Sequence, residues 1–302
     1  SMSEALINLI ATSIAAVVSA FKGLLVPIIF FSLLAMLMRR KKALGDLRRA
    51  LPEIHLNVKL MLFDAMFIVP MIIILGTFLS ELVRDNGLSL LSLDTWSELP
   101  GWLTILIAIA IADFVGYWRH RLEHTWVLWP AHAVHHSDTQ MTWIAVQRFH
   151  PINRFTTFVI DNLALFLLGV PPFAIVANGL VRHYYGAFIH ADLPWTYGPL
   201  GRIFVSPAMH RWHHATDPRA FDTNFATVFS LWDQMFGTCR VPGPCDVPTG
   251  VTDNMKQSLR GQLIYPFTKK AYPQIFGKSE AATEAPAPEQ NDVSASARRL
   301  EQ

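Results

Sequence analysis

The chain has 302 residues, of which 52% are hydrophobic and only 16% are charged, and its mean hydropathy is +0.30. Soluble domains carry roughly 25% charged residues, so this composition argues against an ordinary soluble protein. Its uncharged stretches are long enough for a bilayer core of ~30 Å, which needs roughly 20 apolar residues. The net charge of +2 gives no indication of nucleic-acid binding. We therefore predict an all-α, multi-pass integral membrane helical bundle.

Residues 1–100 are expected to form N-terminal membrane helices and loops. An apolar stretch over residues 6–38 is interrupted at Lys22 and Gly23. It predicts one span over 23–38 after an amphipathic or partly inserted helix, or else two short spans. Residues 39–49 follow with six basic residues and one acidic residue, and the positive-inside rule predicts a cytoplasmic loop. A second span is expected over 60–83 and a third over 102–118, returning the chain to the cytoplasmic side.

A second apolar region covers residues 155–189 and is broken by "GVPP" at 169–172. Proline cannot continue a helix, and each arm would be only ~25 Å long at 1.5 Å per residue. These features predict a membrane hairpin that returns His190 to the side from which the chain entered. A catalytic domain over 101–240, a cytosolic segment over 241–277 and a disordered tail over 278–302 complete the expected organisation. His55 is interpreted as a loop residue.

Eight of the twelve histidines fall into three tight groups. Residues three or four apart on a helix share a face, so each group directs its imidazoles toward one place. Neutral imidazole is a good ligand for iron, zinc and copper. Eight ligands exceed what one ion accepts, so the pattern favours two ions. The groups are His120 and His124, then His132, His135 and His136, and finally His210, His213 and His214.

The histidines also allow other interpretations. A single histidine at a membrane edge is usually a hydrogen-bonded interfacial residue. Structural zinc sites are four-coordinate and usually contain cysteine, whereas this chain has only Cys239 and Cys245. A bis-histidine haem protein needs its ligands near membrane depth. A metal transporter or another non-redox metal-binding protein remains an alternative of a different class, although we find no internal repeat of the kind common in transporters.

The motifs together resemble the fatty acid hydroxylase and sterol desaturase superfamily of membrane di-iron enzymes. The resemblance covers residues 109–238 and includes "DFVGYWRHRLEH", "WPAHAVHHSD", "FIHADL", "SPAMHRWHH" and "NFATVFSLWDQMFGT". It implies an all-helical membrane fold with a cytosol-facing di-metal site of two iron ions. Members use dioxygen and external electrons to hydroxylate, desaturate or demethylate lipids.

By this resemblance, the eight grouped histidines correspond to metal ligands and His190 to a ninth. The predicted hairpin supports His190 independently. His183, two helical turns before His190, is a possible tenth ligand or an outer hydrogen-bond partner, or a polar contact inside the bundle. His150 lies in "RFHP", where relatives often have His-Pro-x-Glu; here the last position is Asn153. We therefore interpret His150 as structural or as a support for the ligands.

Four carboxylates lie near the histidines in sequence: Asp113, Glu123, Asp138 and Asp233. Ligating histidines usually donate their other N–H to a carboxylate or a carbonyl, so these residues are candidates for that supporting role. Glu123 has an alternative as an exposed partner of Arg119 or Arg121. Asp113 stands inside an apolar run, where an ionisable group is functional by default.

The sequence thus predicts an oxygen-dependent lipid hydroxylase, with a desaturase using the same site as the alternative. We expect the protein to lie in the bacterial inner membrane or in the endoplasmic reticulum, and to take its lipid substrate from that bilayer. No haem domain, ferredoxin motif or flavin fingerprint is found, so we expect an external donor, cytochrome b5-like or a ferredoxin with its reductase. The basic residues 39–49 are a possible docking surface for it. Zinc is expected as a substitute for iron in purified protein.

Overall fold

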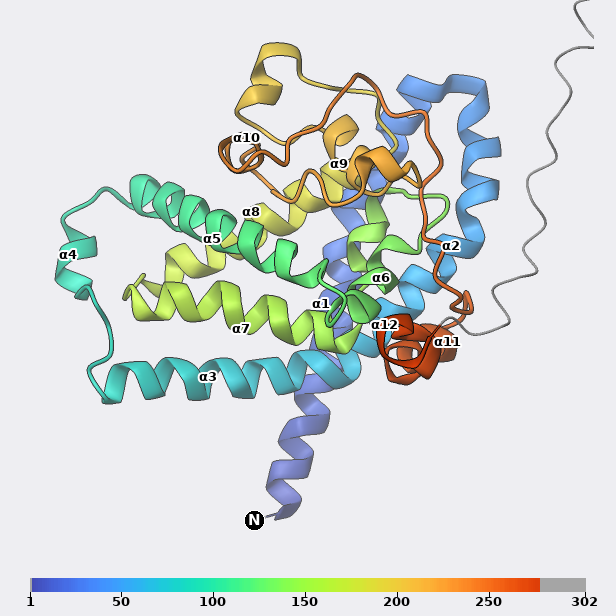
Figure 1. Cartoon of the computed structure of the whole chain (residues 1–302). Helices are drawn as coiled ribbons and strands as arrows, with labels where there is room; N and C mark the ends of the chain where they lie inside the picture. The colour runs from blue at the N-terminus through green and yellow to red at the C-terminus, as the bar shows by residue number, and fades with distance from the viewer. Residues whose placement is uncertain (1, 278–302) are drawn as a thin grey trace, which may run out of the picture.

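A computed structural model describes residues 2–277 (Figure 1). The predicted disordered tail, 278–302, lies outside the described residues. Within the described part the chain is all helical, with two isolated β-bridges and no strand. The predicted helical class is therefore confirmed.

Helix α5 (Gly101–Glu123) is the centre of the bundle. It packs against both α7 (Pro151–Leu167) and α8 (Pro172–His190), while α3 (Val69–Asp85) covers α7. Ala108 and Ala112 are fully buried in α5 and pack with Leu165 and Ala174 of the other two helices. Small side chains at these positions let the backbones approach closely. The bundle therefore aligns the ends of α5 and α8, where histidines occur.

The turn between α7 and α8 follows the predicted "GVPP" break. Gly169 has φ +65°, which glycine adopts without the cost that a Cβ imposes, and a Cβ at this position would clash with the carbonyl oxygen of Leu91. Pro171 is the N-cap of α8 and Pro172 its first residue, the position where a fixed φ and a missing N–H are tolerated. The helical hairpin is present, and His190 is the last residue of its second arm.

The N-terminal region differs from the prediction. Helix α1 (Met2–Arg39) is continuous for 38 residues through Gly23 and Pro27, without a separate preceding helix. A glycine inside a helix costs only about 1 kcal/mol, too little to end a helix this long. The basic residues 39–49 are not a loop either: a 3₁₀ turn, Arg40–Lys42, leads directly into α2 (Ala43–Phe63). His55 lies exposed within α2, so its interpretation as a loop residue is wrong.

The predicted second span over 60–83 is divided. The π-helical segment Asp64–Ile68 separates α2 from α3, and the chain changes direction there (Figure 1). A π-turn interrupts the regular i to i−4 hydrogen bonds and commonly accompanies a kink. Here it places Asp64 beside Arg154 of α7, with 2.8 Å between the carboxylate and the guanidinium. A tertiary ion pair thus marks the corner.

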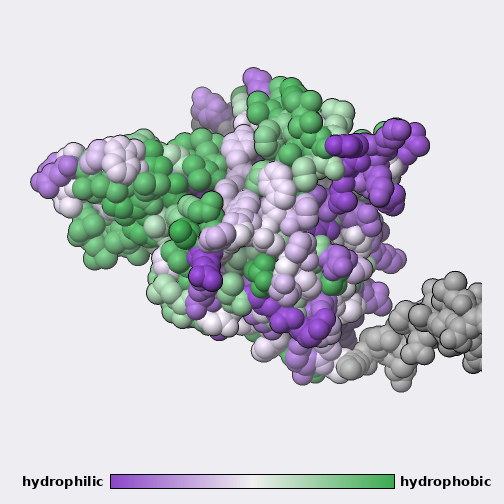
Figure 2. Space-filling view, turned by 90° about the horizontal axis from the view of Figure 1, so that it is seen from above, coloured by the Kyte–Doolittle hydropathy of each residue, from purple (hydrophilic) through white to green (hydrophobic). Residues whose placement is uncertain are grey.

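Two helical stretches in the described residues, Met2–Asp85 and Gly101–Glu123, are long and apolar enough to cross a membrane. The first comprises α1, α2 and α3 with their short connections. In Figure 2, hydrophobic side chains cover much of the part of the molecule where α4 (Leu93–Ser97) lies in Figure 1, apart from a hydrophilic tip. Hydrophilic side chains gather on the opposite side. This division fits association with a membrane.

Short helices surround the other end of the bundle. Helix α6 (Trp129–His136) contacts α5 and α7, and α9 (Pro207–His213) contacts α8. Helix α10 is Leu231–Met235, α11 is Leu259–Ile264 and α12 is Pro273–Phe276. The last two belong to the predicted segment 241–277, which packs through Met255, Tyr265 and Ala271 on α2 and α6. These elements enclose the place where the histidines converge.

Candidate metal centre

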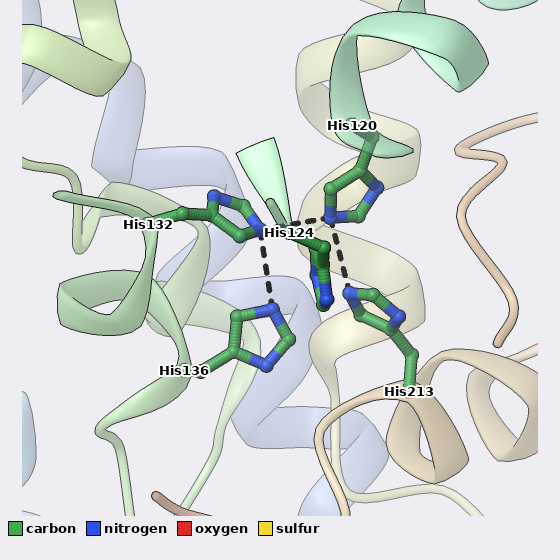
Figure 3. A group of neighbouring side chains, drawn as sticks. All are labelled: His120, His124, His132, His136 and His213. Atoms are coloured by element: carbon green, nitrogen blue, oxygen red, sulfur yellow. Dashed lines mark hydrogen bonds between the residues drawn. The ribbon is translucent and has the colours of Figure 1, made fainter. Parts of the chain in front are cut away.

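All nine histidines predicted as metal ligands converge in the structure, in two adjacent groups. Within each group the candidate ligand atoms all lie within 4.8 Å of one another. Group A, shown in Figure 3, takes its residues from the end of α5, from α6 and from α9. Group B draws on α6, α8 and the end of α9. Group A is His120, His124, His132, His136 and His213, and group B is His135, His190, His210 and His214.

These imidazoles are buried, which fixes their protonation. Burial lowers the pKa of His132 to about 3 and the pKa of His213 to about 4. Burial together with neighbouring imidazoles holds the pKa of His135 and His214 well below the usual value. Neutral imidazole has a free ring nitrogen. Near pH 7 these rings are therefore in the form that binds metal.

The outer nitrogen of most rings faces an acceptor. Nδ1 of His120 donates to the carbonyl oxygen of Phe225 at 2.6 Å, and Nδ1 of His132 donates to Oδ1 of Asn153 at 2.9 Å. Backbone carbonyls accept in the same way from His135, His190 and His213. Because a neutral imidazole carries one proton, a ring that donates through Nδ1 presents the lone pair of Nε2 inward.

The inward nitrogens approach one another closely. In group A, Nε2 of His120 is 2.9 Å from Nε2 of His132 and 3.0 Å from that of His213, the contacts dashed in Figure 3. In group B, Nε2 of His190 is 3.0 Å from Nε2 of His210 and 3.2 Å from that of His135. With the protons on Nδ1, the contacts among His120, His132 and His213 join lone pairs, which repel unless a cation lies between them.

The spacing and the donor chemistry both fit a pair of metal ions. Ligands about 2.1 Å from an ion and at right angles to each other are about 3.0 Å apart, close to the distances within each group. Nε2 of His124 is also buried without a hydrogen-bond partner. Nitrogen-only sites suit iron, zinc, copper or nickel rather than magnesium or calcium. Each group therefore fits one such ion.

The predicted carboxylate supports do not act as predicted: none of the four makes a hydrogen bond to a histidine ring in the described residues. Asp113 instead accepts from the backbone N–H groups of Val228 and Phe229, at 3.0 and 2.8 Å, and from the indole of Trp232. Its side chain faces the segment before α10 because it lies on the buried side of α5, about two turns from His120. Asp113 thus anchors this segment.

Asp233 acts one step from a ring. Its carboxylate accepts from the backbone N–H groups of Phe225 and Ala226, at 2.8 and 2.9 Å. The carbonyl of Phe225 is the acceptor for His120. Asp233 therefore fixes the backbone that orients a candidate ligand, although it never touches the ring.

Glu123 reaches a ring only through another side chain, and Asp138 belongs to a separate buried network. Glu123 forms an ion pair with Arg119 at 2.6 Å, as its alternative interpretation expected. Glu123 is buried, however, so the expectation of an exposed pair is wrong. It accepts from Nδ2 of Asn153 at 2.6 Å, and its nearest oxygen is 3.6 Å from Nδ1 of His132. Asp138 accepts from Nδ2 of Asn57 at 2.9 Å and belongs to a buried network with Arg148.

Two further histidines lie outside both groups. His183 is exposed on α8, and its Nε2 is 3.5 Å from the amide nitrogen of Gln147. The prediction of a tenth ligand is wrong, because seven residues of helix separate it from His190 by about 10 Å along the axis. His150 caps α7 by accepting from the N–H of Ile152, and its Nε2 faces the carbonyl of Leu263 at 3.0 Å. The structural interpretation of His150 agrees with these contacts.

Sequence reasoning missed the residues that do hold the rings. Asn153, interpreted as a weakening departure from a family motif, is the acceptor for His132 and is itself held by Glu123. Asp222, not considered, lies 3.2 Å from Nδ1 of His124. The motif around "RFHP" could have indicated Asn153, because this position is polar both here, as asparagine, and in relatives, as glutamate. Nothing in the sequence indicates which backbone carbonyls face the other rings.

A cavity of about 310 Å³ reaches group A from outside the bundle. His124, His136 and His213 form part of its lining, together with Trp126 and Trp129. Among the described residues that line it, none is a histidine of group B. The two groups therefore differ in access.

The fold and the site define an all-helical protein that has two stretches apolar enough to cross a membrane and two adjacent histidine groups that could each hold a metal ion. Residues 105–238 match the sequence model of the fatty acid hydroxylase family. The predicted resemblance is thereby confirmed. All nine converging histidines fall inside the matched region.

Similar proteins include an ornithine lipid hydroxylase of Rhizobium tropici, 33% identical over 61% of this chain and 56% of its own length. An alkylglycerol monooxygenase of Caenorhabditis elegans is 30% identical over 51% of this chain and 31% of its own. A delta(7)-sterol 5(6)-desaturase of Gibberella zeae is 29% identical over 49% and 42%. The chain thus spans about a third to just over half of these relatives, all oxidoreductases by name. No solved structure matches it significantly.

Proposed function

We propose that this protein is an oxygen-dependent membrane oxidoreductase that hydroxylates a C–H bond of a lipid, using two iron ions held by the nine histidines. The observation that carries the proposal is the convergence of inward Nε2 lone pairs in two groups, as in His120 with His213 and His190 with His210. Bound iron would supply the activation of dioxygen that attack on an unactivated C–H bond requires.

The protein itself orients the histidine rings and encloses the candidate metal centre. The hydrogen bonds from Nδ1 fix most of the rings and their tautomers, for example in His120 through Phe225 and in His132 through Asn153. Such outer partners keep ligands oriented and raise their basicity. Burial of the rings excludes water from most of the centre, which strengthens the electrostatic interactions there.

Membrane topology is part of the proposal. We place the apolar end of the bundle in the bilayer and the metal centre on the cytoplasmic side, with several helices crossing or entering the membrane. The turn between α1 and α2 contains four basic residues, Arg39, Arg40, Lys41 and Lys42. Basic residues are enriched on the cytoplasmic side of membrane proteins, which supports this orientation. A bilayer location would deliver lipid substrates directly to the protein.

Electrons would come from a separate donor protein that docks at this basic turn. Arg39 pairs with Asp192, and Asp192 is also 3.4 Å from Arg211 of α9. Arg211 lies next to His210 in the chain, so the turn connects to the edge of group B through two ion pairs. An acidic partner surface would complement the charge of this region.

Metal analysis and lipid analysis test the proposal together. Protein purified without oxygen should hold about two iron ions per chain, and a single loosely bound ion would contradict the assignment. Lipids from cells with and without the active protein should differ by a gain of one oxygen atom. A loss of two hydrogens would instead show a desaturase, an outcome that the similarity to a sterol desaturase makes worth measuring.

A further inference from the structure

The cavity beside group A has a distinctive chemical lining. Its polar residues include Asp222 and Asp253, and within the described lining there is no lysine or arginine. Trp126 and Trp129 form aromatic parts of the wall, and Nε2 of the buried His124 is unpartnered at its inner side. Acidic and aromatic groups together favour a cation, through Coulomb attraction and through the faces of the rings.

Both aspartates keep free acceptor capacity. Asp222 is paired with Nδ1 of His124 at 3.2 Å, and its side chain is 73% exposed. Asp253 accepts from the indole of Trp129 and from the hydroxyl of Tyr265 at 2.7 Å. Arg121, whose charge acts on Asp222, stands over the rings of Tyr117 and Trp118 and does not line the cavity.

An apolar track leads to this cavity along α5. Phe114, Trp118 and Leu122 follow each other at four-residue spacing, and all three are exposed. Residues at this spacing form one stripe on a helix. Trp126, 48% exposed, comes three residues after the last residue of α5 and lines the cavity itself. Phe221, 53% exposed, adds apolar surface to the cavity lining. The track on this candidate membrane helix therefore runs toward the chain segment that lines the cavity beside group A.

We infer that the cavity binds the positively charged, amine-bearing head group of a lipid whose hydrocarbon chain lies along the Phe114–Trp118–Leu122–Trp126 track. A volume of about 310 Å³ is at the lower end for small-molecule sites, enough for a head group rather than a whole diacyl lipid. This inference rests on the proposed function for one consequence only: oxidation would fall on a carbon near the head group.

Binding of three C18 amphiphiles to the metal-free full chain tests the inference. Octadecylamine, octadecanol and octadecanoic acid share a chain and differ in head-group charge, and native mass spectrometry in detergent compares their occupancy. The amine should bind more tightly than the acid by about tenfold. Asp222→Asn and Asp253→Asn should each reduce the amine-to-alcohol ratio roughly fivefold, the size of a partly exposed ion pair.

Two controls separate charge recognition from loss of structure. Asp246→Asn removes the same charge from an exposed position outside the cavity and should leave the ratio unchanged. Trp126→Ala should weaken the binding of all three ligands. Equal or tighter binding of the acid, or an unchanged ratio in the Asp222 variant, would overturn the inference.

Because these measurements use protein without metal, they are independent of the oxidation reaction. Selective amine binding in a protein that never takes up iron would contradict the proposed function and leave the inference about the head group standing. Two irons and an oxygenated lipid, found together with equal binding of amine and acid, would remove this inference alone.

Discussion

The two histidine groups differ in how their rings are held and in what reaches them. In group A, Nδ1 faces an acceptor in His120, His124, His132 and His213. In group B, Nδ1 faces an acceptor in only two of the four rings; in His210 and His214, both buried, Nδ1 has no hydrogen-bond partner. Group A opens onto a cavity, whereas group B does not line it. Group A therefore combines access from outside with oriented ligands, whereas group B is enclosed and two of its rings lack an outer acceptor.

Loss of one ligand from either group should have the largest effect. His120→Ala in group A and His190→Ala in group B should each lower the iron content from about two ions per chain to about one and reduce oxidation to background. Metal analysis and product detection measure this, with circular dichroism to check the helices. His55→Ala, an exposed histidine on α2, is the control. Full iron content in the His190 variant would show that group B is not a metal site.

Removal of the side chain that orients His132 should have the next largest effect. Asn153→Ala deletes its acceptor and should lower metal affinity or turnover 10–100-fold, as is typical for outer partners of ligands. Asn162→Ala is a matched control on the same helix, since Asn162 bonds only its own helix backbone at Phe158. Equal effects of the two changes would mean that the orientation of His132 is unimportant.

A change in the hairpin turn should lower the stability of the whole helical bundle, and not the metal affinity of one group. Gly169→Ala forces a side chain into a positive φ and against the carbonyl of Leu91, which should cost about 1–3 kcal/mol of stability. Thermal or denaturant unfolding measures this. Gly179→Ala is the control, since it lies in α8 with nothing within 4 Å of the added Cβ and should be neutral or slightly stabilising. A neutral Gly169 variant would show that the turn does not hold α8 in place.

The smallest effect concerns the rate of metal release. Only group A meets the cavity, through His124, His136 and His213. A small hydrophilic chelator should therefore remove metal in two phases, with the first phase emptying group A. The phases should be separable by following metal release in the His120→Ala and His190→Ala variants, which should lose the fast and the slow phase respectively. One phase with the same rate in both would remove the proposed difference in access.

The sequence indicated which histidines meet, eight from their spacing and His190 from the family resemblance and the predicted hairpin, and helix geometry explains part of their division into two groups. At 100° per residue, positions i and i+4 lie 40° apart, whereas i+3 and i+4 lie 100° apart. His132 and His136 accordingly share group A, and His210 and His214 share group B. The middle residues, His135 and His213, join the opposite groups. The spacing predicted that each cluster directs all its rings toward one place, whereas the structure divides each three-histidine cluster between the two groups.

The packing of helices far apart in the sequence sets which pair of histidines belongs to which group, and which acceptor holds each ring. Helix α6 meets the ends of α5 and α8 at once, so its three rings divide between two sites. The acceptors are mostly backbone carbonyls, which every residue carries and no motif marks. Asp113 and Asp233, conspicuous in the sequence, were used to fix backbone segments instead. Side-chain chemistry thus named the ligands, whereas packing of backbone segments far apart in the chain set their orientation.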